Sequence, residues 1–250
     1  NSVVMREIII LLTAAMLCVS CSEQFNAAYL LSGGAKVAQA AVLSDAQIQS
    51  YVGQYVQKLD AENTVLPETS PYVKRVRKMT SGITSVNGTP LNFKVYKTNE
   101  INAFACADGS VRIYSGLLDA MTDDEALGVV GHEIGHVKLG HSKTKMRTAL
   151  LASAGRDTLA ASGNANVAAL TQGQLGALAE GFVNAQFSQK EESAADEYGY
   201  RFMKRHQYDP AALASMFRKL SSDGGLMSSH AGSEARAGRI DAMIKKDSKR

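Results

Sequence analysis

Apolar side chains recur at helical spacing from about residue 43 to residue 61. This spacing places them on one face of an α-helix, and Ser44 stands where a helix N-cap is expected. The apolar positions are Ile48, Tyr51, Val52, Tyr55, Val56 and Leu59. A second helix is predicted to begin at Pro71, because proline suits the first turn and apolar residues follow at helical spacing.

The apolar period changes from helical to two in the stretch LNFKVYKT. Leu91, Phe93 and Val95 alternate there with Asn92, Lys94 and Tyr96, which predicts a half-buried strand behind the turn NGTP. The following NAFACADGSVRIYSG predicts two short extended runs, broken at Asp108 and Gly109. The remaining pattern is mostly helical. The sequence therefore predicts an α+β fold, mainly α-helical, with a small β-sheet.

The segment GHEIGH places His132 and His136 four residues apart, with Glu133 directly after the first histidine. A helix is expected to begin just before it, because TDDE from Thr122 to Glu125 has the form of a capping box. Residues four apart lie about 40 degrees apart around a helix, so both imidazoles can bind one ion. Imidazole nitrogens suit Zn²⁺. Glu133 projects about 100 degrees away from His132, where it can accept a proton from an activated water.

The alternative is that these are two ordinary half-buried histidines beside a solvated glutamate. That interpretation does not explain why a polar triplet interrupts an otherwise apolar helix. Three of the chain's five histidines also fall between residues 132 and 141. The third, His141, would lie on the opposite face of a continued helix, so we interpret it as a helix-end residue rather than a ligand.

A catalytic zinc ion needs a third protein ligand, and candidates occur in FSQKEESAADEYGY. The strongest apolar stripe of this predicted helix brings Glu191 towards the core. A second stripe of small residues brings Glu192 there instead, so helix geometry alone leaves both open. The Ala- and Gly-rich stretch 149–179 that precedes this segment is interrupted by charged and amide residues, which favours a flexible connection or lid over a transmembrane helix.

The segments HEIGH, ESAAD and HAGSEARAGRI resemble the HtpX-like and Oma-like zinc metallopeptidases, which form metallopeptidase family 48 and are of the gluzincin type. The resemblance covers most of the chain after about Asn92, and small periplasmic lipoprotein members look most similar. It implies a zincin-like fold and one zinc ion per chain, with Glu192 as third ligand and Asp196 as a carboxylate behind the ligands. It also implies an edge strand that binds peptide, formed by Asn102, Ala103, Phe104 and Ala105.

The resemblance places His230 near the active site, as a fourth, inhibitory zinc ligand or as a hydrogen-bond donor to the transition-state oxyanion. The chain departs from the family at two positions. Ala231 stands where a proline is usual after this histidine, and Gln189 stands where an arginine is common. Neither departure changes the three predicted zinc ligands.

The N-terminal stretch MREIIILLTAAMLCVSC, which begins at Met5, predicts a targeting segment with an apolar run too short to span a bilayer comfortably. Its ending resembles a bacterial lipoprotein signal whose last residue, Cys21, carries lipid, although Cys18 stands where leucine is usual. We therefore predict a signal peptide over 1–21, a tether over 22–42 and one metallopeptidase domain over 43–250. Ser22 after the lipidated residue favours a periplasm-facing position on the outer membrane.

The composition narrows the class of function. A hydrophobic fraction of 45%, a charged fraction of 20% and dispersed lysines and arginines indicate a globular protein with no nucleic-acid partner. We predict a zinc endopeptidase that degrades unfolded or misassembled proteins in the bacterial envelope, with extended polypeptides as substrates and a lipid anchor to the membrane. The alternative is a non-proteolytic envelope lipoprotein, a chaperone or assembly factor with a structural or vestigial zinc site. Three ligands and a free glutamate favour the enzyme, because structural sites are usually closed by four ligands. No particular protein partner is indicated.

Overall fold

The structure, a computed structural model, describes residues 44–154, 173, 175–178, 182, 186–222 and 234–249. The predicted signal peptide and tether, Cys21 and His230 lie outside these residues. These described residues belong to one compact unit. Its larger helices are α3 (Asp45–Glu62), α4 (Pro71–Met79), α6 (Asp123–Lys138), α7 (His141–Ala154), α9 (Gln189–Arg205), α10 (Ala211–Ser222) and α11 (Glu234–Asp247). The mainly helical α+β class predicted from the sequence is confirmed.

The first two helices begin where the pattern predicted. Ser44 caps α3 and exchanges side-chain and backbone hydrogen bonds with Gln47, which forms a capping box. Pro71 is the first residue of α4. Within the described residues, no helix is both long and apolar enough to cross a lipid bilayer.

The central sheet has three strands in the order β3-β5-β4. They are β3 (Asn92–Tyr96), β4 (Ala103–Ala105) and β5 (Ser110–Tyr114), followed by the short helix α5 (Ser115–Ala120). β5 runs parallel to β3 and antiparallel to β4, and within the described part of the chain β4 pairs with β5 alone. A separate hairpin of β1 (Ser85–Val86) and β2 (Thr89–Pro90) turns at Asn87 and Gly88, which both have positive φ.

One expectation for β3 was wrong. Tyr96 was placed on the polar face of a half-buried strand, but it is only 1% exposed. The C-terminal turn of α3 covers this face, because Asp60 accepts hydrogen bonds from Tyr96, Arg112 and Lys94. Burial would raise the pKa of Asp60, but these donors lower it to about 2. The buried charge therefore ties α3 to the sheet.

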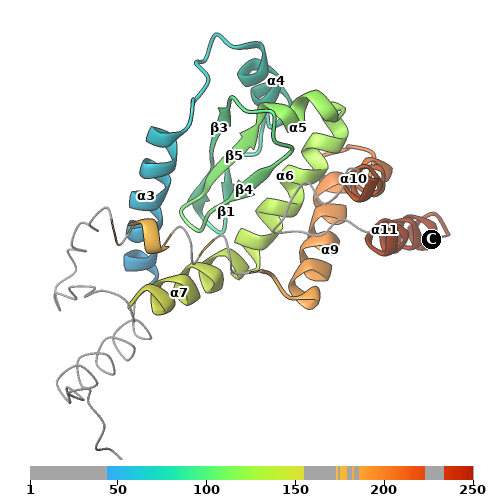
Figure 1. The fold of residues 1–250 in the computed structure, drawn as a ribbon. Helices are drawn as coiled ribbons and strands as arrows, with labels where there is room; N and C mark the ends of the chain where they lie inside the picture. The colour runs from blue at the N-terminus through green and yellow to red at the C-terminus, as the bar shows by residue number, and fades with distance from the viewer. Residues whose placement is uncertain are drawn as a thin grey trace, which may run out of the picture. The chain divides into compact units, whose positions relative to one another are not determined.

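The opposite face of the sheet packs against helices. Val95, Val111 and Ile113 join one apolar core with residues of α6, α9, α10 and α11. α6 runs between the sheet and α9 (Figure 1). Gly131 allows this close approach, because a Cβ atom there would lie 2.5 Å from a ring carbon of Phe202 on α9. A second, smaller core joins α3 to α7.

Candidate metal centre

Helix α6 presents both motif histidines on one buried face. Thr122 caps the helix and forms the predicted capping box with Glu125, so His132 and His136 fall in its interior. They are 2% and 0% exposed, and their Nε2 atoms are 3.1 Å apart. The local sequence alone accounts for this pair.

Helix α9 brings Glu192 to the same point. Its Oε2 lies 3.4 Å from His132 Nε2, and its Oε1 lies 3.6 Å from His136 Nε2. The start of the helix explains why Glu192 and not Glu191 reaches the histidines. Ser188 caps α9. The Glu191 carboxylate turns back and accepts hydrogen bonds from the backbone N–H and the hydroxyl of Ser188.

The three residues could hold a metal ion. Their ligand atoms all lie within 4.8 Å of one another. Tetrahedral zinc with nitrogen ligands at about 2.0–2.1 Å requires ligand atoms about 3.3 Å apart. The observed separations of 3.1 to 3.6 Å match this requirement.

Asp196 lies one turn beyond Glu192 on α9 and contacts His132. Its Oδ1 is 3.1 Å from His132 Nδ1, so the histidine can keep a proton on Nδ1 and leave Nε2 for a metal. Burial alone would lower the pKa of His132, but Asp196 and Glu192 raise it to about 9. Without a metal the imidazole is therefore protonated at neutral pH, and metal binding must displace a proton.

Arg236 of α11 was not assigned a role from the sequence. Its guanidinium bonds both oxygens of Asp196, and its Nη2 lies 2.9 Å from Glu192 Oε2. The same group stacks over the Phe217 ring at 4.1 Å. Burial would raise the pKa of Asp196, but the bonds from His132 and Arg236 lower it. Arg236 thus favours the ionised form of Asp196 and pairs with Glu192, and only the HAGSEARAGRI resemblance pointed towards it.

His141 does not lie on the face opposite the motif, as was expected, although it is not among the three candidate ligands in the described part of the chain. Helix α6 ends at Lys138, and Gly140 turns the chain with φ +78°, so helical spacing no longer applies. His141 begins α7, and its Nδ1 lies 3.1 Å from His136 Nδ1. The ring of Phe187 stacks on the imidazole of His136, and their ring centroids are 3.8 Å apart. His136 is therefore oriented by a histidine and a phenyl ring.

Glu133 is 2% exposed and lies on the β4 side of α6. Burial lowers the pKa of Lys145 and raises that of Cys106, the residue after β4, and the nearby charge of Glu133 acts upwards on both values. Along β4, Asn102 and Cys106 bond to β5, so the backbone groups of Ala103 and Ala105 face away from the sheet. The Asn102 side-chain oxygen is buried without a hydrogen-bond partner among the described residues. The edge strand and the carboxylate thus lie on the same side of the motif helix.

The sequence comparison decides the family. The profile of Peptidase family M48 matches residues 67–244. The chain belongs to Peptidase family M48. Three curated relatives support this family assignment. The chain is 42% identical to metalloprotease LoiP of Escherichia coli (strain K12), over 86% of this chain and 85% of that protein. It is 40% identical to metalloprotease YcaL of the same strain, over 86% of each chain.

The third relative is the beta-barrel assembly-enhancing protease of Escherichia coli (strain K12). It is 36% identical, over 53% of this chain and 28% of that protein. These relatives and the M48 match make the protein a metalloendopeptidase, a hydrolase of peptide bonds. They also agree with the predicted resemblance to family 48.

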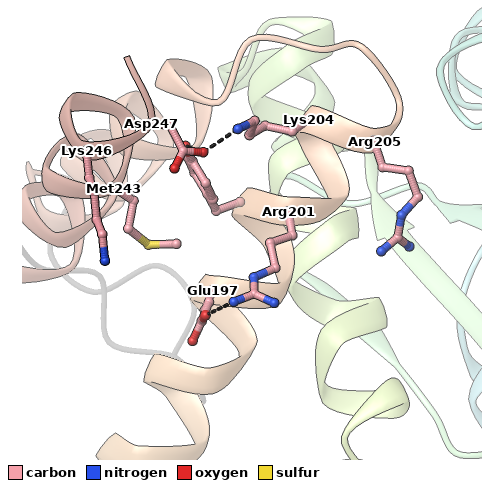
Figure 2. A pocket seen from close by; sticks show the side chains of 8 residues that line it. Glu197, Arg201, Lys204, Arg205, Met243, Lys246 and Asp247 are labelled. Carbon is pink, nitrogen blue, oxygen red and sulfur yellow. Dashed lines mark hydrogen bonds and ion pairs between the residues drawn. The ribbon is translucent and has the colours of Figure 1, made fainter. Parts of the chain in front are cut away.

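A groove of about 750 Å³ lies between α9 and α11 of this M48 peptidase. Figure 2 shows its lining, where Arg201 pairs with Glu197 and Lys204 pairs with Asp247. None of the residues that line it belongs to the metal cluster. This groove is therefore separate from the candidate metal centre.

In this M48 peptidase we expect His141→Ala to weaken metal binding about 10- to 100-fold, the usual effect of losing a group that orients a ligand. His136 would lose the partner that directs its Nε2 towards the metal. Competition titration with a chromogenic zinc chelator measures the affinity. His206→Ala, which removes a histidine from the end of α9, is the control. Unchanged affinity of the His141 variant would show that this contact does not orient His136.

Proposed function

We propose that the protein is a zinc-dependent endopeptidase that cleaves unfolded or misassembled proteins in the bacterial cell envelope. The observation that carries this proposal is the buried cluster of His132, His136 and Glu192, with the Glu133 carboxylate on the same helix. Three protein ligands are typical of a catalytic zinc site, whereas structural sites usually have four.

The proposed chemistry divides between the ion and the chain. A bound zinc ion supplies Lewis acidity, which polarises a carbonyl and lowers the pKa of water towards about 7. Glu133 accepts the proton of the attacking water and returns it to the leaving amine. Asp196 and Arg236 keep His132 and Glu192 in place throughout.

Substrate binding is proposed along β4. The strand is an edge strand, and the outward backbone groups of Ala103 can pair with an extended peptide. Folded proteins seldom offer an unpaired extended segment, because their strands are paired or protected. This requirement supports a preference for unfolded or misassembled proteins, as does the name of the relative that enhances beta-barrel assembly.

The cellular position is part of the proposal. Lipid attached to Cys21 would hold the enzyme on a periplasm-facing membrane surface, with the tether of residues 22–42 leading to α3. This rests on the sequence of the N-terminal segment. Mass spectrometry of the mature protein from a bacterial membrane fraction should find a diacylglyceryl-modified Cys21 at its N-terminus. An unmodified cysteine there would contradict the anchor.

The activity is tested with β-casein, an unfolded protein, and with folded ribonuclease A. We expect cleavage of β-casein only, loss of cleavage after treatment with a chelator, and recovery on addition of zinc. Ribonuclease A that has been reduced and alkylated should become a substrate. Equal cleavage of folded and unfolded ribonuclease A would contradict the substrate class, and cleavage unaffected by metal removal would contradict the mechanism.

A further inference from the structure

Lys145 of α7 is a buried residue, and the chemistry described above does not use its ammonium group. The residue is 8% exposed. Its Nζ lies 4.6 Å from the centroid of the Phe187 ring and 4.7 Å from that of Phe182. Among the residues that the structure describes, no side chain or backbone group makes a hydrogen bond or ion pair with it.

This environment is unfavourable for a positive charge without a counterion. The free energy needed to remove an ammonium group from water is much larger than the stabilisation from contact with two phenyl rings, so buried lysines are usually paired. Burial lowers the pKa of Lys145, and the carboxylates of Glu133 and Glu192 oppose that change. The ammonium therefore has unused capacity to bind an oxygen acceptor, and a negatively charged one most strongly.

Lys145 lies beside the proposed path of the substrate. Ser142, one turn earlier on the same helix, donates a hydrogen bond of 3.2 Å to the outward carbonyl of Ala105 at the end of β4. Phe187, which contacts the ammonium, also stacks on His136. The lysine thus lies on the helix that bonds the end of β4, against the ring that stacks on His136, and Glu133 and Glu192 are both close enough to act on its charge.

We propose that Lys145 forms a subsite for a carboxylate of the peptide substrate, either an aspartate or glutamate side chain near the scissile bond or the C-terminal carboxylate. The subsite rests on the proposed function, since it serves the same peptide. It would give the enzyme a preference for acidic groups at one position along the cleft. Lys145 acts here as a specificity residue and takes no part in proton transfer.

The test measures binding rather than hydrolysis. Zinc-loaded protein with Glu133→Gln is titrated with short fluorescent peptides, in which one glutamate is moved through every position. A matched set carries glutamine instead, and all of these peptides are C-terminally amidated. A third set has a free C-terminal carboxylate. Fluorescence anisotropy gives the Kd of each peptide.

We expect one glutamate position to bind about tenfold or more tightly than its glutamine partner, as for a hydrogen bond between charged groups. Adding Lys145→Met should remove that preference, and adding Lys145→Arg should keep part of it. Lys143→Met is the matched control, because Lys143 lies on the same helix but is exposed and pairs with Asp45. If only free-acid peptides show the preference, the C-terminal carboxylate is the ligand.

The subsite is overturned if no position and no terminus shows a carboxylate preference, or if the preference survives Lys145→Met. The first result is measured on the protein with Lys145 intact, so it tests the subsite even if the Lys145→Met variant does not fold. The titrations also separate this inference from the proposed function. Failure to cleave β-casein would contradict the activity, while a lysine-dependent carboxylate preference would still support the subsite.

Discussion

Glu133→Gln is expected to reduce the rate of β-casein hydrolysis by about 10²- to 10⁴-fold, the usual effect of losing a general base. The amide has nearly the shape of the carboxylate but cannot accept a proton from water. Because Glu133 lies about 100 degrees around α6 from His132, its replacement should leave the three ligand atoms in place. Metal content, measured by inductively coupled plasma mass spectrometry, should equal that of the wild type.

The control is Glu62→Gln, which makes the same change on an exposed residue of α3 that pairs with Lys58. It should leave hydrolysis and metal content unchanged. Full activity of the Glu133 variant would contradict its role as base. Loss of metal from that variant would instead show that Glu133 helps to hold the ion. A non-proteolytic assembly factor would show no difference between the wild type and the variant.

Glu192→Ala is expected to leave the protein with little or no bound zinc. Only two of the three ligands would remain, and losing a ligand should cost more than the 10- to 100-fold in affinity that follows loss of an orienting group. Hydrolysis should fall together with metal content. Zinc content after dialysis against a weak chelator measures the effect.

Glu191→Ala is the matched control, because it removes the neighbouring carboxylate from the same helical turn. Among the described residues Glu191 hydrogen-bonds only to Ser188 at the start of α9, so its loss should cost about 0.3–1.5 kcal/mol of stability and no metal. Thermal unfolding would detect the cost. Retention of zinc by Glu192→Ala, or its loss from Glu191→Ala, would show that the assignment of the third ligand is wrong.

Local sequence determined much of this protein. The capping box at Thr122 and the spacing of His132 and His136 were sufficient to place two imidazoles on one helix face, and the structure has both features. The β4 and β5 runs and their break at Gly109 were also predicted. These features depend on residues within a few positions of one another, where backbone periodicity and capping act directly.

Tertiary structure decided the rest of the site. Helix periodicity left Glu191 and Glu192 as alternatives. The capping box at Ser188 engages Glu191, and the packing of α9 on α6 brings Glu192 to the histidines. Arg236 and Lys145 come from helices whose positions the apolar pattern does not give. His141 was misplaced because a glycine with positive φ ended the helix that was assumed to continue. Periodicity tells which side chains share a face, but which faces meet depends on how separate elements bury apolar surface together.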